Sequence, residues 1–146
     1  MASAIHRLVI LTVSYHSQEA LKLLEEGLSL QTRQPFKWLI IDNSPKTAPV
    51  KLKTQLPVAL ISGEEGDGFA LGCNRGLFEL EKNGWSGWVW LLNPDISFID
   101  ENTLEKVADQ LDTLPADSLV GTAVLGPDGK LEKSAGWIDS GLNFRS

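Results

Sequence analysis

The sequence predicts an α/β three-layer sandwich with a mostly parallel central sheet, formed by one domain over residues 1–146. Short runs of apolar and β-branched residues alternate with segments of helical periodicity, as in strand–helix–strand folds. The first run, residues 8–15, is almost continuously apolar, which is typical of a strand buried on both faces of a parallel sheet. The length of 146 residues and the hydrophobic fraction of 42% suit one compact domain with a core.

Strands are predicted where apolar runs are bounded by loop residues. They cover residues 8–15, 36–42, 58–62, 88–92 and 119–125, and residues 130–133 are expected to pair back across a turn at 126–129. Prolines at positions 45, 49 and 57 make the segment between the second and third strands a loop. Trp88 and Trp90 share one strand face and are expected to pack in the core.

Three helices are predicted between these strands. The first starts at an N-cap, Ser17, and runs to about residue 30, with a face formed by Ala20, Leu21, Leu24 and Leu28. The second follows the glycine-rich segment 63–72 and ends at Asn83, because Gly84 is a typical helix stop. The third is capped by Asp100 and has an apolar face of Leu104, Val107, Ala108 and Leu111.

Composition excludes several functional classes. The net charge of −6, with no basic run, argues against nucleic-acid binding. The single cysteine, Cys73, offers no disulfide or zinc spacing and fits a reducing cytoplasm, with attachment to the inner face of the membrane left open. No stretch reaches the ~20 apolar residues of a membrane span, and residues 1–7 do not resemble a signal peptide.

Polar residues gather where the predicted strands end. Residues 14–16 (Ser-Tyr-His) follow the first strand, 42–44 (Asp-Asn-Ser) the second, and Asn93 and Asp95 the fourth. In open parallel sheets, ligands bind beyond the carboxyl ends of the strands. One edge of the sheet is therefore expected to carry the chemistry.

Each candidate motif has a structural alternative. Asp42 can accept hydrogen bonds from a nucleobase or a ribose, or it can stabilise its loop; a Rossmann site is disfavoured because residues 13–17 lack glycine. The segment 66–76 brings glycines to a helix N-terminus, which suits an anionic ligand or close helix packing. Pro94 makes the turn 93–95 rigid, so Asp95 either holds Mg²⁺ or Mn²⁺ or belongs to an ordinary turn.

In their order along the chain, these motifs resemble family 2 glycosyltransferases, in particular the rhamnosyltransferase-like branch. The family has a Thr/Ser-Tyr-Asn/His-Ser motif and a Gly-Phe-Ala-x-Gly-x-Asn-x-Gly segment, matched here at 14–17 and 68–76. It also has an Asp-Asn-(Ala/Gly)-Ser motif, to which residues 42–44 are similar. The family motif Leu-Leu-Asn-Pro-Asp is identical to residues 91–95, and a Gly-Pro-x-Gly turn ahead of Ser-Gly is similar to 126–129 and 134–136.

The resemblance implies a C-terminally truncated GT-A fold that binds a UDP- or dTDP-sugar and a divalent metal, Mg²⁺ or Mn²⁺. Asp95 would bind the metal, for inverting transfer to an acceptor hydroxyl of a saccharide or a lipid-linked saccharide. The remaining implied nucleotide-sugar ligands are Ser14, Tyr15, His16, Asp42, Asn43, Gly68, Asn74, Arg75 and Asn93.

Two departures and one rival accompany this interpretation. Gly66 stands where the family has Asn, and the catalytic base is expected in a region beyond the matched motifs, so no residue here is assigned to that role. The rival is a degenerate domain that acts through protein contacts, including homo-oligomers. Nucleotidyl transfer is disfavoured because no basic glycine-rich loop follows the first strand.

Overall fold

The structure is a computed structural model, and it describes residues 3–133, 137–138 and 144–145. Contacts divide the chain into two compact units, Met1–Thr113 and Leu114–Ser146. The single domain over residues 1–146 stays a prediction.

The first unit is built on a four-stranded sheet in the order β3-β2-β1-β4, with every neighbouring pair parallel. The strands are β1 (Ser3–Ser14), β2 (Arg33–Asp42), β3 (Val58–Ser62) and β4 (Trp88–Leu91). The predicted mostly parallel sheet is thus confirmed. β1 starts five residues earlier than expected because its first residues pair with the start of β2, across a register shift between Ile5 and Val9.

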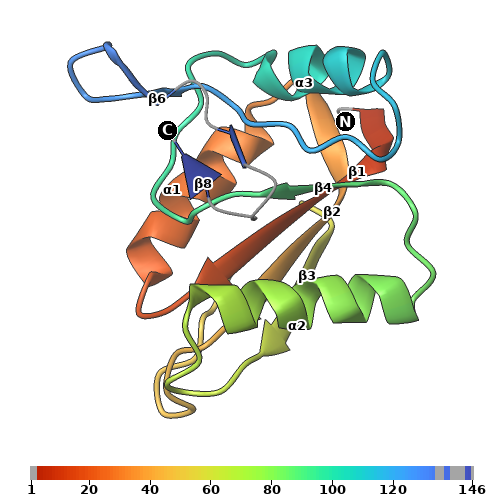
Figure 1. The fold of residues 1–146 in the computed structure, drawn as a ribbon. Helices are drawn as coiled ribbons and strands as arrows, with labels where there is room; N and C mark the ends of the chain where they lie inside the picture. Colours follow the sequence, from red (N-terminus) through yellow and green to blue (C-terminus); the bar gives the residue numbers. More distant parts are fainter. Residues whose placement is uncertain (1–2, 134–136, 139–143, 146) are drawn as a thin grey trace. The chain divides into compact units, whose positions relative to one another are not determined.

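Helices cover both faces of this sheet, as Figure 1 shows: α1 (Gln18–Ser29) and α3 (Thr103–Leu111) lie on one face and α2 (Phe69–Lys82) lies on the other. Alternate residues of the strands point to opposite faces and form two cores. Ile10 and Ile40 pack with the leucines of α1 and α3, whereas Leu11 and Ile41 pack with α2. The three-layer sandwich predicted from the sequence is confirmed for this unit.

The tryptophans of the sheet are core residues. Trp38 has no exposed surface, and its indole N–H donates to the buried Thr12 hydroxyl at 3.0 Å. Trp88 and Trp90 pack against the core of the α1 and α3 face, as predicted. Trp85 precedes β4 and stacks on Phe36, with ring centroids 5.2 Å apart.

The amino end of the sheet is closed by a buried carboxamide. Gln31 is 3% exposed; its Nε2 donates to the Asp100 carbonyl at 2.8 Å, and its Oε1 accepts from the Leu104 N–H at 3.0 Å. Asp100 was expected to cap α3 directly. Instead, the N-cap is Asn102, and the Asp100 carboxylate accepts from the Asn102 N–H, because Asp100 lies two residues before the cap position.

In the second unit, the predicted strand 119–125 is wrong in extent. Only β5 (Val124–Leu125) is a strand, and it pairs antiparallel with β6 (Leu131–Lys133). The turn between them is as predicted: the Gly126 N–H donates to the Lys130 carbonyl at 2.8 Å, and Gly129 has a positive φ of 74°. An apolar run becomes a strand only where a partner strand supplies hydrogen bonds, and residues 119–123 are not assigned to one.

β7 (Trp137–Ile138) and β8 (Phe144–Arg145) also pair antiparallel. The family-like Ser-Ala-Gly at 134–136 lies outside the described residues. Within the part of the chain that the structure describes, no helix has the length and apolarity needed to cross a membrane.

Candidate donor-binding site

The carboxyl ends of the strands meet at one edge, as parallel pairing requires. Ser14 at the end of β1 is in register with Asp42 at the end of β2, which is in register with Ser62 at the end of β3. The structure therefore brings together the first two predicted polar segments. On the other side of β1, the chain leaves β4 at Leu91 opposite Leu11 and enters the turn that contains Asp95.

The chain passes from buried to exposed between Ser14 and Tyr15. Ser14 is fully buried, and its hydroxyl has no hydrogen-bond partner within the protein. Tyr15 and His16 are exposed, and their rings make an edge contact with centroids 4.4 Å apart. His16 has a positive φ of 50°, and its N–H donates to the Ser44 hydroxyl at 3.0 Å, so the loop after β1 is tied to the loop after β2.

Asp42 shapes the loop that follows it. Its carboxylate is 4% exposed and accepts from the Ser44 N–H at 3.0 Å with Oδ1 and from the Val50 N–H at 2.8 Å with Oδ2. These contacts show that Asp42 stabilises its loop, one of the two alternatives that the sequence left open. Each carboxylate oxygen keeps a second acceptor direction, so a contact with a ligand N–H or hydroxyl is compatible with this geometry.

Asn43 joins β2 to the glycine-rich segment. It is 1% exposed, and its Nδ2 donates to the Asp67 carbonyl at 2.9 Å, while its Oδ1 has no partner within the protein. A Cβ at Gly63 would lie only 1.8 Å from this Oδ1, so the position requires glycine. Asn43 is therefore clamped between two parts of the loop that leads into α2.

The glycine-rich segment becomes helical earlier than predicted. α2 begins at Phe69, with Gly68 as an N-cap that offers no side chain to the first turn. A Cβ at Gly72 would lie 2.5 Å from Val13 and one at Gly76 2.4 Å from Leu11, so these glycines serve close packing of α2 on β1. Gly68, like Gly66, has open space around it, so a ligand could approach the backbone there.

Arg75 is engaged by a residue that the sequence did not single out. Its Nη2 lies 2.9 Å from Oδ2 of Asp67, and the two side chains are 36% and 21% exposed. Asn74, one position earlier on α2, is exposed. A spacing of eight residues across a helix start gives no periodic signal, which is why Asp67 was missed.

The turn after β4 presents Asn93 and Asp95 to solvent, with Pro94 between them. Among the described residues, no group of three His, Cys, Asp or Glu side chains could hold a metal ion. Asp95 alone offers one carboxylate, so this donor set fits Mg²⁺ or Mn²⁺ only if phosphate oxygens and water complete the shell, which is usual for Mg²⁺.

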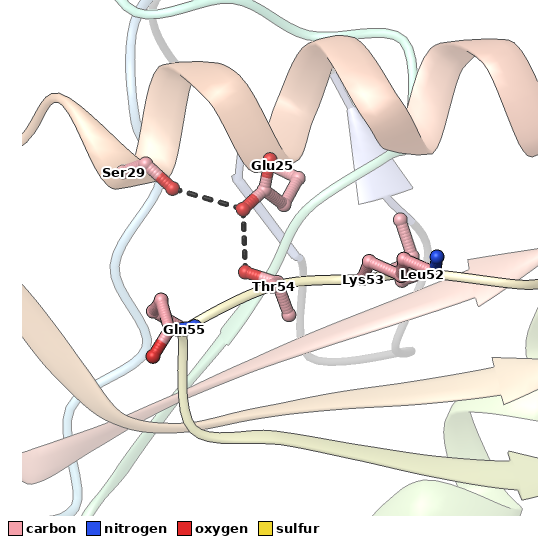
Figure 2. Close-up of a pocket in the computed structure, with 6 residues that line it drawn as sticks. All are labelled: Glu25, Ser29, Leu52, Lys53, Thr54 and Gln55. Carbon is pink, nitrogen blue, oxygen red and sulfur yellow. Dashed lines mark hydrogen bonds between the residues drawn. The ribbon is translucent and has the colours of Figure 1, made fainter.

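Two features elsewhere carry no candidate chemistry. Burial raises the pKa of the Cys73 thiol, in agreement with its predicted role as a small apolar residue. A shallow depression lies beside α1 and the segment that leads into β3, and Figure 2 shows that Glu25 there accepts from Ser29 and Thr54. Its carboxylate thus stabilises the loop between β2 and β3.

Comparison with known proteins defines the class. Residues 9–144 match the family model described as Glycosyl transferase family 2, so the chain belongs to this family. It is also similar to the uncharacterized glycosyltransferase YwdF of Bacillus subtilis (strain 168), with 31% identity over 109 residues. This alignment covers 73% of the chain and 39% of that protein. No solved structure matches the chain significantly.

The family match bears on two predictions from the sequence, the class of reaction and the fold. It supports a transferase at the family level, and the observed parallel sheet is consistent with a GT-A glycosyltransferase fold. The rival of a degenerate, purely associating domain is not favoured by the match.

Proposed function

We propose that the carboxyl edge of the sheet binds a nucleotide-diphosphate sugar, with UDP or dTDP as the nucleotide, together with Mg²⁺ or Mn²⁺. The reaction proposed for the whole protein is inverting transfer of the sugar to a saccharide or lipid-linked saccharide hydroxyl in the cytoplasm, within a rhamnosyltransferase-like branch. The observation that carries the proposal is the meeting of Ser14, Asp42 and Asn43 at one edge, where two buried polar atoms lack partners.

Those two atoms, the Ser14 hydroxyl and the Asn43 Oδ1, are unusual because buried polar groups are nearly always hydrogen-bonded. A ligand or an ordered water would satisfy them. In the proposed complex, Tyr15 and His16 offer ring surfaces to the nucleobase, and Asp42 and Asn43 offer hydrogen-bond acceptors. This arrangement would fix the orientation of the nucleoside before any chemistry occurs.

The diphosphate would lie between the start of α2 and the turn after β4. Backbone N–H groups beyond Gly68 are free of a capping side chain and suit an anion, and Asn74 and Arg75 lie on the same helix. Asp95, with Asn93 beside it, would hold the metal, which stabilises negative charge on a leaving nucleoside diphosphate when bound. The base that deprotonates the acceptor is not assigned to any residue of this chain.

Isothermal titration with UDP and with dTDP, each with and without Mn²⁺, tests the proposal. At least one nucleotide should bind with a dissociation constant below the millimolar range, and Mn²⁺ should strengthen that binding. Asp95→Ala should abolish the effect of Mn²⁺. The matched control is Asp109→Ala, which removes an exposed carboxylate from α3. Absence of binding to both nucleotides at millimolar concentration would overturn the proposal.

A further inference from the structure

The pair formed by Asp67 and Arg75 lies in the segment that joins β3 to α2. Arg75 reaches back along α2 so that its Nη2 lies 2.9 Å from the Asp67 carboxylate, one residue before the helix cap. Its Nε is buried and has no hydrogen-bond partner within the protein. The guanidinium therefore has donor capacity that Asp67 alone does not use.

The charges around this pair disfavour an anionic ligand. The segment 63–68 carries Glu64 and Glu65 as well as Asp67, and both glutamates are exposed. Arg75 is the one cation between residues 63 and 81 of the sequence. While it is paired with Asp67, its charge is neutralised, and a diphosphate that approaches α2 meets a net negative surface.

The backbone of Asp67 is held independently of its carboxylate. The carbonyl accepts from Asn43 Nδ2 at 2.9 Å, and the N–H donates to the Glu64 carbonyl at 3.0 Å. The carboxylate can consequently leave Arg75 by rotation of its own side chain, without movement of the loop. A partly exposed ion pair of this kind is weak enough to be exchanged.

We propose that Asp67 is the exchangeable counter-ion of Arg75: it occupies the guanidinium in the free protein and yields it to the diphosphate of the donor. The inference rests on the proposed function, since it concerns the same site. Asp67 is a positioning residue in this scheme, because it holds Arg75 extended toward the start of α2 while it lowers the affinity for phosphate. A ligand must carry enough negative charge to displace it.

Asp67→Asn separates the two roles of the side chain. The amide keeps an acceptor for Arg75 and nearly the same shape, but it removes the competing charge. At constant Mg²⁺, UDP and dTDP should bind roughly three- to fivefold more tightly than to the unmodified protein, the scale of a partly exposed ion pair. Uridine and thymidine, which lack phosphate, should bind unchanged.

Two further variants make the result specific. In an Arg75→Gln background, Asp67→Asn should give a smaller gain in diphosphate binding, because the cation that it frees is absent and only the repulsion between its charge and the diphosphate is relieved. Asp109→Asn removes the same charge from α3 and should leave all affinities unchanged. Thermal melting checks the fold of each variant, and Asp67→Ser replaces Asp67→Asn if the latter unfolds.

Three outcomes would overturn the inference: unchanged or weaker diphosphate binding by folded Asp67→Asn, an equal gain for the nucleosides, or a gain that is undiminished without Arg75. If the unmodified protein binds neither diphosphate, the proposed function itself fails. If it binds one and Asp67→Asn has no effect, only the exchange of Asp67 is wrong.

Discussion

Two buried carboxamides, Gln31 and Asn43, lie at opposite ends of the same sheet and differ in one respect. Both are almost fully buried, and both join segments that are distant in the sequence. Both ends of the Gln31 amide are hydrogen-bonded, whereas the Asn43 Oδ1 has no partner within the protein. The satisfied amide closes the fold at the amino end, and the half-satisfied one lies where a ligand is expected.

The largest expected effect follows from replacement of Gln31. In Gln31→Leu, the Leu104 N–H and the Asp100 carbonyl lose their buried partner, so the free energy of unfolding should fall by roughly 2–4 kcal/mol. Urea denaturation followed by circular dichroism measures the change. The control Gln55→Leu alters an exposed glutamine and should stay within about 0.5 kcal/mol. An equal loss in both variants would contradict the structural role of Gln31.

A methyl group added beside Asn43 should have the next largest effect. The Cβ in Gly72→Ala would lie 2.5 Å from Val13 and 3.2 Å from Asn43 Nδ2, so α2 must shift, at about 1–3 kcal/mol of unfolding free energy. Gly68→Ala enters open space and serves as the control. If both variants melt at the same temperature, Gly72 does not pack as closely against Val13 of β1 as the structure indicates.

Asn43 itself should matter more for binding than for stability. Asn43→Ala loses one buried hydrogen bond but also removes an unpartnered atom, so we expect a loss of only about 1 kcal/mol of unfolding free energy. Nucleotide affinity should fall tenfold or more, because the acceptor and the position of the glycine loop are both lost. Asn102→Ala, at a cap without a side-chain hydrogen bond, should affect neither property strongly. If Asn43→Ala lost as much unfolding free energy as Gln31→Leu, Asn43 would have the same structural role as Gln31, and the proposed difference between them would be wrong.

The smallest expected effect is on the pH dependence of stability, through Asp100, whose carbonyl accepts the hydrogen bond from Gln31. The hydrogen bond from Lys106, helped by Thr103, holds the pKa of Asp100 below its ordinary value of 3.8. Because the pKa is lowered in the folded state, the stabilisation is complete above pH 3.8 and is lost as the pH falls through the folded value. Asp100→Asn should therefore make stability less dependent on pH below about 4. An unchanged acid transition would show that the exposed pair with Lys106 has no effect.

The elements of the first unit could be predicted because their residues have a strong period. Buried runs in β1 and β2 and the leucines of α1 are visible in the sequence alone. The start of β1 and the strand at 119–125 were misjudged because strand limits depend on pairing partners rather than on local composition.

In the candidate site too, some features are visible in the local sequence and others depend on residues that are distant in the chain. The edge of the sheet was predictable, since parallel strands place their carboxyl ends together. The contacts of Asn43 with Asp67 and of His16 with Ser44 span 24 and 28 residues and leave no trace in local patterns. The need for glycine at position 63 likewise arises from a side chain that is distant in the sequence.

The left-handed backbone at His16 gives a physical meaning to one letter of the family motif. The motif allows Asn or His at this position, and these are among the few residue types besides glycine that adopt positive φ with little penalty. The alternation between an amide and an imidazole then follows from the turn between β1 and α1 and needs no shared contact with a ligand. Variation at position 16 should accordingly include Gly and Asp but exclude Val and Ile.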